Sequence, residues 1–467
     1  MPNAIEPRAL TADRLLLAPE QLMLPDGPVT DHAVLVSAGS FAEIGPAAEL
    51  VARHPDLAPI HLPRHLLMPG FVDAHHHLSQ CFGKALAFGE PSEIFRRIWV
   101  PLETSMTEPM VHLAAKLGAL EALRGGFTTV VDAGTRAAGD VAAIATAARE
   151  AGLRCVLGAI CNDLVGGIEA DAATILDAAG RHLTKWEADE LIHPSLAISI
   201  PEVASDCMLR AVSGLCAEAG AVFQTHANEH LVAVERSLVA RGRRPIELLH
   251  HLGVLGPQVL LAHATLLTPH ELVALRESDT AIAYNPIATA WKGNAAAPAE
   301  LMGALGIRFG IGTDGTRADG FRLVDSAETT QRLAFGLATG DFSTGGGWPW
   351  LEHATAAGAE AVGLGGVTGR IAPGLAADFL LVDLDVPEML PSWDLTWELV
   401  RLANRDQIIA VFVAGRLRLW RGWPVDWDAR ALLREVAEMA APVLAAAPIQ
   451  RIHPLSTEHR RIGRGSR

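Results

Sequence analysis

Eight short apolar runs, each followed by a stretch with helical spacing, recur through the middle of this chain. They lie at 67–77, 126–134, 154–163, 195–203, 221–229, 259–265, 281–286 and 308–315. The runs are continuously apolar rather than alternating, which is typical of strands buried on both faces, as in a parallel sheet. Intervening stretches such as DVAAIATAAREAG (140–152) have helical periodicity and end in glycine. Eight β/α units predict an α/β fold of the TIM-like (β/α)8 barrel type, and a doubly wound sheet is the competing arrangement.

The two flanks of the chain have a different pattern. Residues 1–66 and 370–423 contain short apolar runs between glycines and prolines, with little helical periodicity, which indicates strands and turns. We therefore expect a small composite β-sandwich domain from residues 1–66 and 366–427 beside a barrel of residues 67–365. Residues 428–467 are expected to form a helix and then a polar, poorly ordered end.

Charge and hydropathy exclude several classes of partner. The 467-residue chain is 50% apolar and has a formal net charge of −15. Its sequence shows no cluster of basic residues, which argues against a nucleic-acid partner. The first twenty residues lack the pattern of a signal peptide, and the apolar stretch ALLREVAEMAAPVLAAAPI (431–449) carries charges that indicate an amphipathic helix rather than a membrane span. Five scattered cysteines without CxxC spacing indicate neither disulfides nor a thiolate metal site. We expect a cytoplasmic protein that binds a neutral or small molecule, with no nucleic-acid or membrane partner.

The predicted strand ends are rich in side chains that bind metals. His75 and His77 end the first run and share one face of it, because strand side chains alternate. His226, His263 and Asp314 lie near the ends of the fifth, sixth and eighth runs. A single histidine of this kind is more often a hydrogen-bonded core residue, but five ligand-type residues at one barrel mouth are improbable by chance. Imidazole nitrogens and one carboxylate suit a catalytic zinc or iron site with a position left open for water.

Four short motifs resemble a known family when they are taken together. PGFVDAHHH (69–77), HANE (226–229), AHAT (262–265) and GTDG (312–315) occur in an order and spacing similar to the amidohydrolase superfamily. The branch in question holds guanine, cytosine and S-adenosylhomocysteine deaminases and the triazine hydrolases. The resemblance covers nearly the whole chain, and it also implies a homo-oligomer such as a dimer.

The resemblance implies one divalent metal ion, zinc, with iron(II) as the alternative. Its ligands would be His75, His77, His226 and Asp314, and His263 would hydrogen-bond the water that the metal activates. Dinuclear members carry a bridging carboxylated lysine, commonly at the fourth strand, but SLAISIPEV (195–203) contains no lysine. A mononuclear site is therefore expected.

Glu229 bears on the reaction type, because it follows His226 by three residues. In the deaminases that this chain resembles, the corresponding glutamate moves a proton from water to a ring nitrogen. Addition of hydroxide to an amidine-type ring carbon is easier when the adjacent nitrogen is protonated as charge develops. Glu229 and Asp314 would take the protons of the water, and ammonia would leave after protonation. A solvated loop acid is the alternative interpretation of Glu229.

Several residues are candidates for contact with the substrate. Gln80 matches the HHHxxQ arrangement of some purine and triazine members and would face a ring carbonyl or nitrogen. Trp99, Glu103, Asn285, Trp291 and Lys292 could line the pocket, although packing is an equally good explanation for the tryptophans. Arg317, Asp319 and Arg322 depart from the family pattern. Arg317 could bind a carboxylate, nitro or carbonyl group, or form a surface ion pair.

These features predict a metal-dependent hydrolase that deaminates an amino-substituted nitrogen heterocycle, such as a purine, pyrimidine, pterin or triazine. Hydrolysis of a chloro or alkylamino substituent, or opening of a cyclic amide, would use the same activated water. A non-catalytic relative that keeps the fold as a binding module is the alternative from another class.

Overall fold

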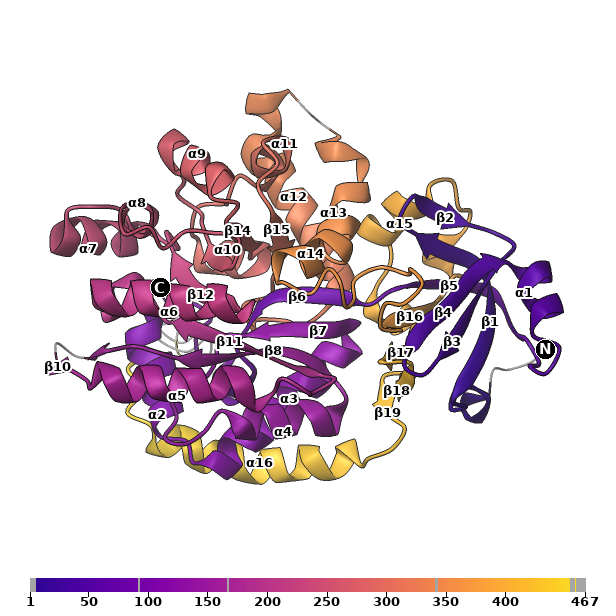
Figure 1. Ribbon diagram of the computed structural model, residues 1–467, viewed down its shortest axis with the longest axis horizontal. Coiled ribbons are helices and arrows are strands. Elements are labelled where there is room, and N and C mark those ends of the chain that lie inside the picture. Colours follow the sequence, from indigo (N-terminus) through magenta and orange to yellow (C-terminus); the bar gives the residue numbers. More distant parts are fainter. Residues whose placement is uncertain (1–5, 91–92, 166–167, 341–342, 454–457, 459–467) are drawn as a thin grey trace, which may run out of the picture.

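The computed structural model describes residues 6–90, 93–165, 168–340, 343–453 and 458. Figure 1 shows a barrel ringed by helices, with a smaller β-sheet unit at one end of it. The barrel strands are β6 (Phe71–His76), β7 (Phe127–Asp132), β8 (Arg154–Ile160), β11 (Ile192–Ile198), β12 (Val222–Ala227), β13 (Val259–His263), β14 (Ala281–Tyr284) and β15 (Phe309–Ile311). They run in the order β15-β14-β13-β12-β11-β8-β7-β6, and each neighbouring pair is parallel. Each of the eight predicted runs contains or overlaps one of these strands, so the barrel prediction is confirmed over the doubly wound alternative.

A buried carboxylate joins the first and last barrel strands. Asp73 on β6 accepts hydrogen bonds from the backbone N–H of Thr313 (2.8 Å) and from its hydroxyl (2.5 Å), just beyond β15. The N–H of Asp314 then donates to the carbonyl of His75 at 2.8 Å. A side chain at Gly312 would not fit here, because its Cβ would lie 2.3 Å from Oδ1 of Asn285. These contacts bring the GTDG turn against the histidine strand.

The helices begin and end where the sequence provides caps. Ser205 accepts from the N–H of Met208 and starts α6, and Gly220, with φ of 62°, ends it. The helices are α1 (Ala47–Arg53), α2 (Val100–Thr104), α3 (Glu108–Arg124), α4 (Ala142–Ala151), α5 (Ala172–Lys185), α6 (Asp206–Ala219), α7 (Leu231–Arg241), α8 (Pro245–His251), α9 (Pro269–Glu277), α10 (Pro286–Lys292), α11 (Ala299–Ala304), α12 (Gly320–Thr339), α13 (Trp348–His353), α14 (Ala356–Ala361), α15 (Leu395–Arg401) and α16 (Ala429–Ala446). Over the described residues, none of them combines the length and apolarity that a membrane crossing needs.

The second unit is one nine-stranded sheet built from both ends of the chain. Its strands are β1 (Arg14–Leu24), β2 (Gly27–Val29), β3 (His32–Ser37), β4 (Ser40–Pro46), β5 (Ile60–Pro69), β16 (Phe379–Asp383), β17 (Ile408–Val413), β18 (Arg416–Trp420) and β19 (Trp423–Pro424). β5 pairs with β16, so the amino- and carboxyl-terminal strands meet in the middle of the sheet. A bridge between Ser40 and Ala376 brings the β4 edge back towards the segment before β16. The sheet thus encloses its own core, where the rings of Phe379 and Phe412 stack with centroids 4.3 Å apart. Two short strands, β9 (Leu164–Val165) and β10 (Ile168–Glu169), pair with each other in antiparallel orientation.

The expected boundaries relate to these elements as follows. Residues 67–69, expected in the first barrel strand, belong to β5, and the barrel strand begins at Phe71. The helix expected from residue 428 is α16, which starts at the Asp428 cap and runs along the barrel in Figure 1. The polar end expected after it lies largely outside the described residues.

A buried ion pair connects the two units. The Arg154 guanidinium on β8 contacts both oxygens of Asp378 at 2.8 and 3.2 Å. The same carboxylate accepts the Ala414 N–H at 2.7 Å and the Thr368 hydroxyl at 2.8 Å. Both ionic groups are almost wholly buried, so their hydrogen bonds are what make the pair tolerable.

Candidate metal centre

The residues predicted as metal ligands, and His263, which was predicted to hydrogen-bond the activated water, lie together at the carboxyl-terminal mouth of the barrel. His75 is in β6, with His77 directly after that strand, His226 is in β12, and His263 ends β13. Asp314 follows β15. The carboxyl ends of parallel strands share one end of a barrel, so residues far apart in the sequence converge here.

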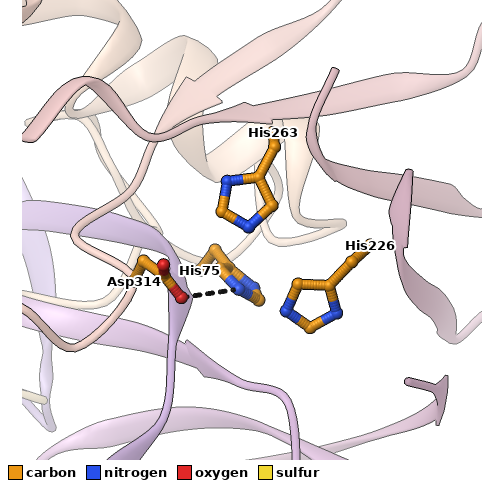
Figure 2. Close-up of side chains that lie close together, drawn as sticks. All are labelled: His75, His226, His263 and Asp314. Carbon is orange, nitrogen blue, oxygen red and sulfur yellow. Dashed lines mark ion pairs between the residues drawn. The ribbon is translucent and has the colours of Figure 1, made fainter. Parts of the chain in front are cut away.

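The spacing of the donor atoms fits one ion. His75, His226, His263 and Asp314 each present one donor atom, and these four atoms all lie within 4.8 Å of one another (Figure 2). Asp314 Oδ1 lies 3.4 Å from His75 Nε2 and 3.3 Å from His77 Nε2, and His226 Nε2 lies 3.4 Å from His77 Nε2. Tetrahedral ligands at about 2.05 Å from a zinc ion are about 3.3 Å apart. His75 Nε2 is also buried with no hydrogen-bond partner among the described residues, as a ligand atom would be before metal binding.

The hydrogen bonds made by Nδ1 of His226 and Nδ1 of His263 distinguish the roles of these two histidines. His226 Nδ1 lies 2.7 Å from the Ser199 carbonyl, which can only accept, so Nδ1 carries the proton and Nε2 keeps a lone pair for a metal. His263 Nδ1 lies 3.2 Å from the amide Nδ2 of Asn285, which can only donate. The proton of His263 therefore sits on Nε2, which faces the cluster. His263 is thus arranged as a hydrogen-bond donor, and His226 as a ligand.

Backbone strain accompanies two of these residues. His263 has φ of 79° and Asp314 has φ of 56°, in the left-handed region that non-glycine residues rarely adopt. Such conformations cost about 1–3 kcal/mol each and persist where the surrounding structure holds them, commonly at functional sites. Here they turn the two side chains towards the cluster at the point where each strand ends.

Glu229 and Lys292 lie on the open side of the cluster. Glu229 Oε1 is 3.8 Å from His263 Nε2, and the Lys292 ammonium is 2.8 Å from Glu229 Oε1 and 2.7 Å from Asp314 Oδ2. Burial acts to raise the pKa of the Glu229 carboxyl, but Lys292 and His263 outweigh it and hold that pKa well below its usual range. The pKa of Asp314 is lowered against the same burial effect, chiefly by Lys292. Both acids are therefore ionised at neutral pH.

Lys292 reaches the site from a helix. It is the last residue of α10, after β14, and it pairs with the two carboxylates as an ammonium. The sequence suggested only that it could line the pocket. Its direct contact with Asp314 was not foreseen.

A cavity opens in front of the cluster. Gln80 and Trp99 line it together with His77 and Lys292, and their contact with substrate stays a prediction. Glu103 does not reach it, because its fully buried carboxylate is bound to Ser79, Gln80 and Arg136.

Two further candidates lie differently from their expected positions. Asn285 contacts His263 and is not among the described residues that line the cavity. The Arg317 side chain is 46% exposed and lies 3.5 Å from Asp319, away from that lining, so its predicted contact with substrate stays a prediction.

Several lining residues were missed by the sequence reasoning. Arg136 stands four residues after β7, in GTRAAG, where a charged side chain after a strand end was a usable signal. Glu90, Glu93 and Arg236 belong to a loop and a helix without a recognisable pattern, and only the tertiary structure brings them to the cavity.

The fold is a (β/α)8 barrel whose strand ends carry clustered imidazoles and a carboxylate, with an acid and a donor histidine beside them. This is the architecture of a metal-dependent hydrolase. The sequence bears this out: the chain belongs to the amidohydrolase family, which it matches over residues 66–418. Residues 33–56 also match an imidazolonepropionase-like composite domain of bacteria.

Individual relatives resemble most of the chain. The 5-methylthioadenosine/S-adenosylhomocysteine deaminase of Nitratidesulfovibrio vulgaris is 28% identical over 417 residues, which cover 89% of this chain and 94% of that protein. The deaminase of the same name from Moorella thermoacetica is 29% identical over 418 residues, covering 88% and 95%. Among solved structures, a zinc-bound adenosine deaminase from Xanthomonas campestris superposes with a TM-score of 0.84 at 25% identity, covering 92% of this chain and 99% of that one. The zinc complex of atrazine chlorohydrolase from Arthrobacter aurescens shares the fold, with a TM-score of 0.79 at 19% identity over 91% and 100% of the two chains.

Proposed function

We propose that this protein removes an amino group from a nitrogen heterocycle by metal-dependent hydrolysis and releases it as ammonia. The observation that carries the proposal is the position of Glu229 and His263. An ionised carboxylate and an imidazole N–H face each other across 3.8 Å, on the open side of the donor atoms of His75, His226 and Asp314. A water molecule attacking a ring carbon there would meet a proton acceptor and a proton donor at once.

The metal would be held by His75, His77, His226 and Asp314. A divalent ion at that position would make water a nucleophile near neutral pH. Zinc is the ion we propose, because the donor atoms are imidazole nitrogens and one carboxylate oxygen at tetrahedral spacing.

The side chains of the chain would then handle the protons. Glu229 accepts a proton as the water attacks and delivers it to the ring nitrogen beside the reacting carbon. His263 donates from Nε2 to the attacking oxygen, which favours the anionic form as the carbon–oxygen bond develops. Asp314 accepts the second proton, the carbon–nitrogen bond breaks, and the amino group leaves as ammonia after protonation. The products are the oxo heterocycle and ammonia.

Ammonia release from a panel of substrates tests the proposal. The panel contains aminopurines, aminopyrimidines, pterins and aminotriazines, together with adenosine, 5-methylthioadenosine and S-adenosylhomocysteine. We expect zinc-loaded protein to release ammonia from at least one ring class, and Glu229→Gln to lower the rate by about 10²- to 10⁴-fold. Glu235→Gln, the same change at an exposed position of α7, is the matched control. No ammonia from any member would count against deamination, and chloride or alkylamine release would replace it with a different leaving group.

Four further features of the protein complete the proposal. We place it in the cytoplasm, as a dimer, with one zinc ion per chain and no nucleic-acid partner. Sedimentation of the purified protein and its metal content by mass spectrometry test the assembly and the metal. A monomer, or a chain purified with iron, would overturn the respective part.

A further inference from the structure

Arg136 places a cation on the wall of the metal cavity. It follows β7 and lines the cavity together with His77, Gln80 and His226. The side chain is only 11% exposed. A buried guanidinium so close to the ligands needs partners, and those partners define what it can still bind.

Three contacts hold the guanidinium in place. Nη1 donates to Glu103 Oε2 at 2.5 Å, and Nη2 donates to the Ser199 hydroxyl at 3.0 Å. The group lies over the ring of Phe95, 4.4 Å from its centroid. Because the carbonyl of Ser199 also accepts from His226, Arg136 is fixed relative to a metal ligand.

Glu103 fixes the neighbouring amide as well. Its other oxygen accepts from Gln80 Nε2 and from the Ser79 hydroxyl, each at 3.2 Å. The amide nitrogen of Gln80 is thus turned towards Glu103, and the amide oxygen is left for the cavity that Gln80 lines. The buried Glu103 carboxylate therefore orients both neighbours, so that the Gln80 amide oxygen can accept a hydrogen bond and the Arg136 guanidinium can donate one side by side.

Arg136 keeps unused donors. A guanidinium has five N–H groups, of which two are bound as described. Nε is buried and has no hydrogen-bond partner among the described residues. Because Arg136 lines the cavity, an acceptor on a bound ligand could pair with the N–H groups that remain.

We propose that Arg136 and Gln80 together recognise a ring carbonyl next to a ring N–H, so that the substrate is an oxo-substituted amino heterocycle. The carbonyl accepts from Arg136, and the N–H donates to the Gln80 oxygen. Because Glu103 neutralises Arg136, this wall has no net charge and favours a neutral lactam edge over a free carboxylate. The inference rests on the proposed deamination and narrows its substrate class.

Pairs of substrates that differ only in the carbonyl test the inference. Cytosine is compared with 4-aminopyrimidine, isocytosine with 2-aminopyrimidine, and isoguanine with adenine. We expect kcat/KM to be about 10- to 100-fold higher for the oxo member of the pair that reacts. Arg136→Met should reduce this preference to less than about threefold and leave zinc content unchanged. Arg136→Lys should not restore the preference, because an ammonium lacks the forked donors. Arg181→Met, on the exposed face of α5, is the matched control.

Failure of this inference is distinguishable from failure of the proposed function. An unchanged oxo preference in Arg136→Met, or a wild-type preference for the oxo-free member, would overturn the inference while deamination stands. If the wild type releases no ammonia from any pair, calorimetry with uracil and pyrimidine decides. Binding of uracil but not pyrimidine, weakened at least tenfold in Arg136→Met, would support recognition of the lactam edge. Equal affinity in the variant would overturn it.

Discussion

The segment after α16 supports one wall of the substrate cavity, so a change there is expected to affect substrate binding. Glu90 lines the cavity, and its carboxylate is fully buried. It pairs with Arg97 at 2.7 Å and Arg451 at 3.3 Å, and it accepts the N–H groups of Ile452 and His453. Arg451 also donates to the carbonyl of Leu86 at 2.8 Å. The carboxyl-terminal segment thus holds the loop of residues 84–90, and the short helix Phe95–Trp99 through Arg97, in place.

Arg451→Met would leave the buried Glu90 with fewer partners. Removing one member of a buried ion pair costs about 3–5 kcal/mol, and Arg97 together with two backbone N–H groups would offset part of that loss. A loss of about 2 kcal/mol in the local stability of the loop raises the population of its open form about thirtyfold. We therefore expect KM to rise, by at most about thirtyfold, with a smaller change in kcat, and trypsin to cleave faster at Arg96 and Arg97 in proportion to the open population.

Steady-state kinetics and timed proteolysis of the zinc-loaded protein measure these effects. Arg434→Met makes the same change at a position of α16 that is 68% exposed, and it should leave both readouts unchanged. A KM within twofold of the wild type, with unchanged proteolysis of the loop, would refute the idea that the carboxyl-terminal segment supports the cavity.

Three further predictions follow from contacts away from the cavity wall. Asn285→Leu removes the donor that sets the tautomer of His263, and we expect kcat to fall about 10- to 100-fold with unchanged zinc content; equal kcat would show that the tautomer is set elsewhere. Arg154→Met strands the buried Asp378 carboxylate and should cost about 3–5 kcal/mol, read as a lower Tm that Asp378→Leu in the same chain partly restores; a Tm unchanged by Arg154→Met would contradict it. Burial lowers the pKa of His353 to about 4 in the folded chain, whereas the unfolded chain binds that proton near pH 6.5, so stability falls as pH drops from 6.5 towards 4. The loss in the free energy of unfolding is about 2 kcal/mol at pH 5. His353→Gln should remove that loss from the pH dependence of the free energy of unfolding, and an unchanged pH dependence would contradict the assignment.

The barrel could be predicted because its strands are buried on both faces. Continuous apolar runs such as VLLAH (259–263) mark those strands without reference to any neighbour. The same runs place His226, His263 and Asp314 at strand ends, and the parallel topology then brings them together. The prediction rested on local pattern and one general property of barrels.

Other parts of the site depend on contacts that no local pattern encodes. Arg136 is defined by Glu103, 33 residues away, and Glu90 by Arg451, more than 360 residues away. Lys292 reaches Asp314 from the last residue of α10. The barrel rule places catalytic side chains at strand ends, so it does not predict a contact that comes from the end of a helix. Residues 84–90 take their position from the carboxyl-terminal segment, so the cavity position of Glu90 could not be read from the local sequence.

The measurement that tests the central claim most directly is a zinc titration of chelator-treated protein, with ammonia release from a substrate identified in the panel as the readout. The proposed ligands His75, His77, His226 and Asp314 would hold one ion, because Asp314 Oδ1 lies 3.4 Å from His75 Nε2 and 3.3 Å from His77 Nε2, so activity should rise in proportion to added zinc and level off at one equivalent per chain. Activity that persists without metal, or that requires two equivalents, would contradict a mononuclear hydrolytic site.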